Sequence, residues 1–272
     1  LQAQPSEPVV AAVEAAQRSG QSDGVDAFDL ARPAAFAVHA RPMNRLRRHY
    51  GLPSLGRDLR RIYTDADLAL FSDIPELYGI TGDMPGGIFL GPVRWSPDVP
   101  KPSWWAELDP NRPIIYVTLG SSGDGNQLAP LVQHLQDLSA QVLVATAGAR
   151  GIETGGNVFC ADYLPGDEVA ARASVVICNG GSPTSAQALA AGVPVLGVPG
   201  NLDQFLNMHY LEALGVGLTL RNGELGGPAL PRCVDRLLEE EAFTTAARAL
   251  ATTLARYDTA ERLREAVRRL TG

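Results

Sequence analysis

The sequence predicts an α/β protein whose carboxyl-terminal half is a doubly wound parallel sheet. Two observations support this prediction: short continuous runs of β-branched and aliphatic residues recur in that half, and helix-length segments with apolar residues three or four positions apart separate them. Runs without polar alternation are typical of strands that are covered on both faces. Strands that alternate with helices in this way are joined by crossover connections, which place helices on both faces of the sheet.

The predicted elements follow in order along the carboxyl-terminal half. A buried strand at 114–120 precedes a helix that carries Leu128, Leu131, Val132, Leu135 and Leu138 at helical spacing. A second helix is expected over 202–214, where Gly215 ends it. The tail from about residue 231 is helical in pattern. Further strands are expected at 141–147, 157–163, 174–180, 193–200 and 217–221.

The amino-terminal part has a weaker pattern. The first forty residues show little periodicity and predict no strand, and residues 44–61 are basic and mixed, whereas 65–71 and 87–93 read as short strands. The segment 94–113 holds five prolines and predicts an interdomain linker. The expected organisation is therefore an amino-terminal domain over 1–93, the linker over 94–113, a second domain over 114–242 and terminal helices over 243–272.

Composition limits the function classes. The chain has 272 residues, 45% of them hydrophobic and 19% charged, and no run approaches the ~18 apolar residues of a membrane helix. A net charge of −7 argues against bulk attraction to nucleic acid or anionic lipid, so an anionic ligand needs a local site. The three widely spaced cysteines favour reduced thiols and a cytoplasmic protein.

Two further features concern the origin of the chain. It opens at Leu1 without an initiator methionine or a signal-peptide pattern, which predicts further residues upstream. Of its 23 basic residues only Lys101 is lysine, a bias that indicates a GC-rich bacterial genome.

Ligands of an open parallel sheet bind beyond the carboxyl ends of the strands, and three loops there carry suitable groups. The first, 120–126, offers glycines and the hydroxyls of Ser121 and Ser122. It matches neither full phosphate-loop fingerprint, so an ordinary turn is the alternative. The second loop, 178–189, has Gly180 and Gly181 where a phosphate could approach the backbone.

The second loop continues into a helix. Ser182 is expected to cap it, Pro183 suits its first turn, and Thr184 adds a hydroxyl; an ordinary capped turn is the alternative here too. In the third loop, 199–207, Asp203 and Gln204 could bind sugar hydroxyls, or Asp203 could simply cap a helix.

Together, residues 179–207 (NGGSPTSAQALAAGVPVLGVPGNLDQFLN) resemble the donor-binding motif of the family-one glycosyltransferases, which have the two-domain GT-B fold. The resemblance covers about residues 44–272 and implies that 1–93 is a partial acceptor-side domain. It implies that Asp203 and Gln204 bind the sugar, and that Tyr163, Leu164 and Gln187 bind the nucleoside. The diphosphate would be bound by Ser121, Ser122, Asn179, Gly180, Gly181, Ser182 and Thr184.

Two positions depart from the family pattern. Asn179 stands where a phosphate-binding histidine is usual, and its amide can donate a hydrogen bond but carries no charge. Gln187 stands where a glutamate usually binds the ribose. None of the four histidines, His39, His49, His134 and His209, lies in a matching motif, so no catalytic base is assigned.

The reaction implied by the resemblance is inverting transfer of a hexose from a UDP- or dTDP-sugar to the hydroxyl of a small-molecule acceptor. Helix ends would stabilise the leaving diphosphate, so no metal or cofactor is expected. Asp65 and Asp67 form a D-x-D sequence that is typical of a metal site in another glycosyltransferase fold, but no partner ligand lies nearby. A noncatalytic nucleotide-sugar-binding module and a nucleotide-sugar 2-epimerase remain the alternatives, and a homodimer is compatible with the sequence.

Overall fold

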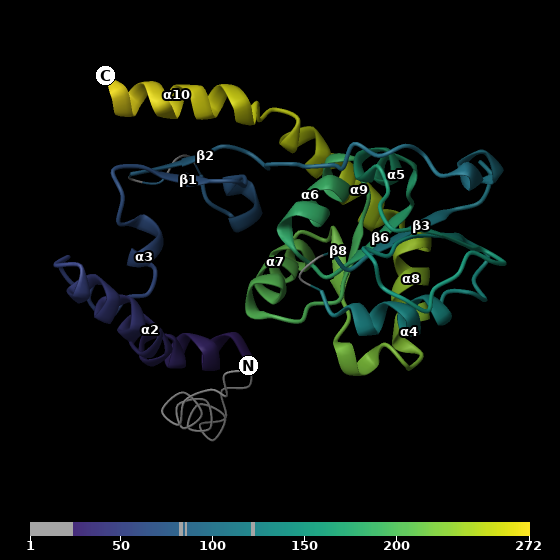
Figure 1. The fold of residues 1–272 in the computed structure, drawn as a ribbon, viewed down its shortest axis with the longest axis horizontal. Helices are drawn as coiled ribbons and strands as arrows, with labels where there is room; N and C mark the ends of the chain where they lie inside the picture. The colour runs from purple at the N-terminus through teal and green to yellow at the C-terminus, as the bar shows by residue number, and fades with distance from the viewer. Residues whose placement is uncertain (1–23, 82–83, 85, 121–122) are drawn as a thin grey trace. The chain divides into compact units, whose positions relative to one another are not determined.

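The computed structural model describes residues 24–81, 84, 86–120 and 123–272, which belong to two compact units (Figure 1). The larger unit comprises 71–82 and 89–265, and the smaller draws its residues from 1–70, 83–88 and 266–272. The predicted linker, 94–113, lies within the larger unit.

The smaller unit is mainly helical. Helix α2 (Gly24–His49) is followed by a loop and the short helix α3 (Arg61–Thr64). The sequence patterns did not predict α2, because its apolar residues do not recur at regular helical spacing and it contains Pro33 and Pro42, two residues that normally break a helix.

The two amino-terminal strands are shorter than predicted. Strands β1 (Ala69–Phe71) and β2 (Gly87–Phe89) form a two-stranded sheet, and the 3₁₀ helix η1 (Pro75–Tyr78) lies between them in the chain. The proline-rich segment contains a second 3₁₀ helix, η2 (Ser103–Glu107). Its Trp104 is buried and donates a hydrogen bond from Nε1 to the Cys160 carbonyl at 3.1 Å, so the segment packs on the larger unit's sheet.

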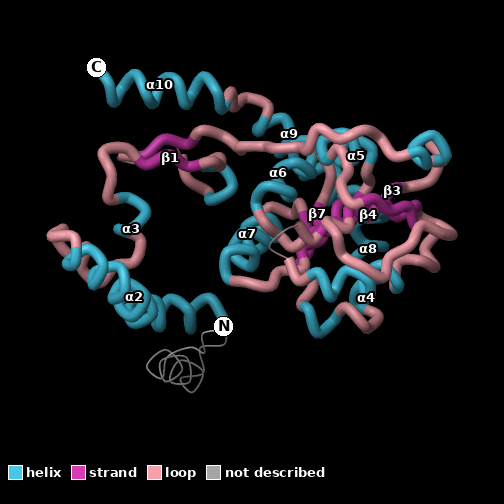
Figure 2. Tube along the Cα trace, in the orientation of Figure 1, coloured by secondary structure: helices cyan, strands magenta, loops and turns pink. Residues whose placement is uncertain are grey.

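The larger unit contains the six-stranded parallel sheet that the sequence predicts (Figure 2). Its strand order is β5-β4-β3-β6-β7-β8, and every pair of neighbours is parallel. The strands are β3 (Ile114–Thr118), β4 (Gln141–Ala145), β5 (Val158–Ala161), β6 (Val175–Cys178), β7 (Val195–Gly197) and β8 (Gly217–Thr219).

Helices cover both faces of this sheet, as Figure 1 shows. Alternate residues of β3 point to opposite faces: Ile115 and Val117 belong to the core under α4 and α8, and Ile114 and Tyr116 to the core under α5, α6, α7 and α9. The doubly wound prediction is confirmed. The remaining elements are η3 (Gly125–Gln127), α4 (Leu128–Gln133), α5 (Gly166–Arg172), α6 (Ser182–Ala190), α7 (Leu202–Ala213), η4 (Asn222–Glu224), α8 (Ala229–Glu239), α9 (Glu241–Leu254) and α10 (Thr259–Thr271).

Among the helices of the described residues, none has the length and apolar character needed to span a membrane. Cys160, Cys178 and Cys233 are free thiols, as the spacing of the cysteines predicted.

Candidate functional site

The strand order locates the crevice where a ligand is expected. From β3 the chain proceeds outward through β4 to β5, and it then returns to the other side of β3 with β6. This reversal is the topological switch point at which open α/β sheets bind ligands. Because Thr118 at the end of β3 pairs with Cys178 at the end of β6, the two following loops leave the sheet at the same level.

The loops after β3 and β6 meet at Asn179. This side chain is 5% exposed, and its Oδ1 accepts a hydrogen bond from the Gly181 N–H at 2.9 Å. A Cβ atom at Gly120 would lie 3.6 Å from Asn179 Nδ2, so the β3 loop passes directly beside the amide. Asn179 therefore shapes the β6 loop and lies beside the β3 loop.

Ser121 and Ser122, the predicted hydroxyl donors of the β3 loop, lie outside the described residues. The residue that follows them, Gly123, is packed tightly against the end of β3. A Cβ atom there would come within 2.2 Å of the Leu119 carbonyl oxygen, so only glycine fits at this position.

Helix α6 begins one residue earlier than its predicted cap implies. Gly181 is the N-cap and makes no side-chain capping bond, and Ser182 is already the first helical residue, so the prediction that Ser182 caps the helix was wrong. Pro183 occupies the first turn as predicted. In a first turn the N–H groups have no intrahelical acceptor, so the amides of Ser182 and Thr184 remain available to an anion.

Helix α7 holds the β6 loop in place from behind. The Asn207 amide donates from Nδ2 to the Gly180 carbonyl at 2.8 Å and to Ser185 Oγ at 3.0 Å. Gly180 has φ +75°, and a Cβ atom there would lie 2.7 Å from Met208 Cγ. No motif in the sequence marks Asn207, although its place one helical turn after Gln204 puts it on the same face of α7.

The predicted sugar-binding pair is divided by the structure. Asp203 is exposed, whereas Gln204 is 2% exposed and its Oε1 accepts a hydrogen bond from the Gly200 N–H at 2.8 Å. The N-cap of α7 is Asn201, whose Oδ1 accepts from the Gln204 N–H at 3.1 Å, so the alternative role of Asp203 as the cap was wrong. Asp203 is thus the member of the pair whose side chain is open to a ligand.

The predicted nucleoside residues lie near the start of α5 and on α6. Leu164 is buried and Tyr163 is 58% exposed. The Gln187 amide donates from Nε2 to the Trp95 carbonyl at 2.6 Å, and a Cβ atom at Gly166 would lie 2.9 Å from Gln187 Oε1. Gln187 therefore connects the segment 94–113 to the start of α5, and the side chain of Trp95 is exposed.

A small cavity of about 20 Å³ lies between α6 and α7, where Ser182, Ser185, Asn207 and Asp73 are among the residues that line it. The volume suffices for one water molecule. Burial raises the pKa of Asp73, although its carboxylate accepts hydrogen bonds from the Tyr78 hydroxyl and the Ile74 N–H.

None of the four histidines is assigned as a catalytic base. His39 and His49 lie on α2, His134 is the C-cap of α4, and His209 lies on α7. In the part of the chain that the structure describes, no group of three or more potential metal ligands occurs. Of the D-x-D pair, Asp65 is ion-paired with Arg47 at 2.8 Å.

Comparison with known proteins connects this geometry to a family. Residues 129–270, more than half of the chain, match the family model "Erythromycin biosynthesis protein CIII-like, C-terminal domain". The chain is 51% identical over 226 residues to a PGL/p-HBAD biosynthesis glycosyltransferase of Mycobacterium tuberculosis, a match that covers 82% of this chain and 53% of the relative.

Two other proteins extend the comparison. A PGL/p-HBAD biosynthesis rhamnosyltransferase of Mycobacterium bovis is 47% identical over 226 residues, which are 82% of this chain and 50% of the relative. The chain thus spans about half the length of these curated relatives. The crystal structure of the glycosyltransferase SnogD from Streptomyces nogalater superposes with a TM-score of 0.62 at 25% identity, covering 85% of this chain and 61% of that one.

Proposed function

Because the chain belongs to the family-one GT-B glycosyltransferases, with a C-terminal domain of the erythromycin biosynthesis protein CIII type, we propose that it binds the nucleotide-sugar donor of a hexosyltransferase. The donor is a UDP- or dTDP-linked hexose, and the reaction is transfer to an acceptor hydroxyl with inversion at the anomeric carbon. The names of the relatives point to an acceptor from PGL/p-HBAD biosynthesis.

One observation supports the proposal above the others: the β3 loop, the β6 loop and the middle of α7 meet at Asn179 and Gly180, at the switch point of the sheet. The free first-turn amides of α6 open from this same loop. A helix N-terminus offers N–H donors and a partial positive charge, each interaction with an anion contributing about 0.3–1 kcal/mol. Several such donors together can hold a diphosphate without lysine.

In this proposal the protein groups have separate roles. The amides of Ser182 and Thr184 bind the diphosphate and stabilise the charge that develops as it leaves. Asp203 accepts hydrogen bonds from sugar hydroxyls, and Tyr163, Leu164 and Gln187 surround the nucleoside. No step is assigned to a metal ion or cofactor, so donor binding and transfer should be insensitive to chelation with EDTA.

The test is isothermal titration of the chain with UDP and with dTDP, and with the corresponding nucleosides. We expect one of the two diphosphates to bind with one-to-one stoichiometry. The substitution Asn179→Asp keeps the shape and the acceptor for the Gly181 N–H but adds a negative charge beside the diphosphate. Like charges about 5 Å apart at an effective dielectric constant of ~20 repel by about 3 kcal/mol, so diphosphate affinity should fall at least tenfold.

Two controls sharpen this test. Binding of the free nucleoside should be unchanged in Asn179→Asp, because the nucleoside carries no phosphate. Asn111→Asp introduces the same charge at an exposed position of the larger unit and should leave every affinity unchanged. Failure of the folded chain to bind either diphosphate would refute the proposal.

A noncatalytic donor-binding module is the second candidate, and the neutral side chain of Asn179 at a position where the family pattern has histidine favours it. It predicts the same binding isotherms with no consumption of a sugar nucleotide. Chromatography of donor incubated with protein and acceptor separates the two candidates, and the anomeric proton coupling of the product by NMR tests inversion.

A further inference from the structure

A second concave surface lies in the smaller unit and has no part in the proposed function. It is a groove of approximately 520 Å³ between the carboxyl-terminal part of α2 and the loop 54–57. Four of its lining residues are arginines, and we call the surface the arginine groove after them: Arg41, Arg45, Arg48 and Arg57.

Two segments of the smaller unit contribute the four arginines of the groove. Arg41, Arg45 and Arg48 are four and three residues apart on α2, so they lie on one face of the helix. Arg57 reaches the same groove because Asn44 fixes the loop: Asn44 Nδ2 donates to the Gly56 carbonyl at 2.7 Å, and its Oδ1 accepts from the Leu55 N–H at 2.9 Å.

The loop 54–57 is also held by a buried side chain and by a further hydrogen bond next to it. The Leu55 side chain is 4% exposed, and the Arg47 Nε donates to the Pro53 carbonyl at 2.7 Å. A loop held by a buried side chain and three hydrogen bonds keeps Arg57 opposite the arginines of α2. The groove is therefore a formed surface with a fixed set of cationic groups.

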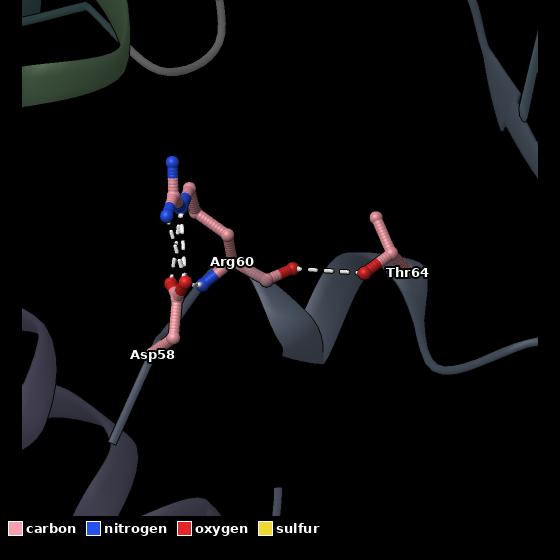
Figure 3. Close-up of polar contacts among 3 residues, drawn as sticks. All are labelled: Asp58, Arg60 and Thr64. Atoms are coloured by element: carbon pink, nitrogen blue, oxygen red, sulfur yellow. Dashed lines mark hydrogen bonds and ion pairs between the residues drawn. The ribbon is translucent and has the colours of Figure 1, made fainter. Parts of the chain in front are cut away.

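The charge of the groove is not balanced from within the described residues. All four arginines are exposed, and no carboxylate in the described ranges forms an ion pair with any of them. Arginines next to the groove behave differently: Arg47 pairs with Asp65 at 2.8 Å, and Arg60 pairs with Asp58 at 2.7 Å, with its guanidinium directly over the carboxylate (Figure 3).

The contrast indicates where an external anion would bind. The whole chain carries a net charge of −7, so four uncompensated guanidinium groups around one groove are a local exception. Guanidinium groups bind phosphate through paired, charge-assisted hydrogen bonds, and several like charges held close together favour a bound counter-charge.

We propose that the arginine groove is a binding site for a phosphate-bearing ligand, distinct from the donor site. Its volume and its four cations exceed what one inorganic phosphate requires, and they fit a diphosphate or a phosphate ester with an organic portion. Such a group reaches the groove either as a soluble phosphate ester or as the headgroup of an anionic lipid.

The first arm of the test uses inorganic pyrophosphate as the probe, titrated into the whole chain at low ionic strength. The double variant Arg45→Gln/Arg48→Gln removes two groove cations at exposed positions, and Arg60→Gln removes one paired cation from the same unit as the control. Far-UV circular dichroism verifies that each variant is folded. We expect the double variant to bind at the groove at least tenfold more weakly and the control to bind as the wild type does.

Pyrophosphate can also enter the proposed donor site, so Asn179→Asp is titrated in parallel. Groove binding must persist in Asn179→Asp and weaken at least tenfold in the double variant, whatever the donor site does. An isotherm that the double variant leaves unchanged overturns the proposal. So does a loss of binding free energy in Arg60→Gln that is half or more of the loss in the double variant, because one removed charge against two would then explain the effect by net charge alone.

The second arm distinguishes the two sources of the phosphate. Co-sedimentation with vesicles of phosphatidylcholine containing phosphatidic acid is compared with that of pure phosphatidylcholine vesicles. Binding to the anionic vesicles that the double variant loses and pyrophosphate displaces identifies a lipid headgroup. Pyrophosphate binding without vesicle binding identifies a soluble ester, and the absence of both in the folded wild type overturns the proposal.

Discussion

Replacing Asn207 with alanine tests whether α7 holds the β6 loop in place. The amide donates to the Gly180 carbonyl at 2.8 Å and to Ser185 Oγ at 3.0 Å. Within the described residues no other donor is bonded to that carbonyl, whereas Ser185 keeps its own bonds to the Gly181 and Ser182 carbonyls. The variant therefore leaves one buried acceptor unsatisfied.

An unsatisfied buried acceptor costs about 1–3 kcal/mol of unfolding free energy. The adjacent cavity of about 20 Å³ lets a water molecule replace the amide, which favours the lower part of this range. Affinity for UDP or dTDP should fall as well, because Gly180 and Gly181 are then free to leave the conformation that presents the first-turn amides of α6.

The assays are urea unfolding followed by circular dichroism, and calorimetric titration with the nucleoside diphosphate. Asn111→Ala, an exposed asparagine of the same unit, is the matched control and should change the unfolding free energy by less than about 0.5 kcal/mol. If Asn207→Ala unfolds with wild-type free energy and binds the diphosphate with wild-type affinity, the amide does not position the loop and the reasoning fails.

Three further predictions follow from the same unit. Gly180→Ala should lower the unfolding free energy measured in urea by about 2–5 kcal/mol, because φ is +75° and the new Cβ would lie 2.7 Å from Met208 Cγ. Gly181→Ala, at a residue with negative φ, should lower it much less, and equal losses would contradict this. Burial raises the folded-state pKa of Asp73, so the stability that this carboxyl group contributes is full below its unfolded pKa and is lost as the pH rises through its folded pKa. Between pH 3 and 7 the unfolding free energy of Asp73→Asn should therefore fall less than that of the wild type. Parallel pH curves for the two proteins would disprove this. Burial raises the pKa of Cys178 to about 12, so native protein at pH 8 should react with a thiol reagent at the same rate with or without Cys178→Ser, and a slower reaction of the variant would show that this thiol is accessible.

Much of the larger unit could be predicted from local sequence patterns. The β-branched runs that form β3, β4 and β6 are buried on both faces. Burial on both faces favours apolar residues, because a polar side chain there would lose its contact with water, and the sequence shows this preference directly. A tight turn into a helix was likewise predicted from Gly180, Gly181 and Pro183. Helix α2 could not be predicted, because its apolar residues are irregularly spaced and it contains two prolines, which normally break a helix.

What each side chain of the candidate site does was decided by packing. The sequence paired Asp203 with Gln204 because they are neighbours, but consecutive positions on a helix point about 100° apart, so one side chain faces solvent and the other turns into the core. Gln187 is bonded to a linker carbonyl 92 residues earlier in the chain, a contact that no local pattern encodes.

The sequence by itself determined the class of fold, the order of strands and helices along the chain and the glycines of the β6 loop, because these depend on burial and backbone freedom at successive residues. Only the tertiary structure brought Asn207 to the Gly180 carbonyl and Arg57 to the arginines of α2. Such contacts join segments whose separation along the chain carries no signal, since their meeting depends on how whole elements pack.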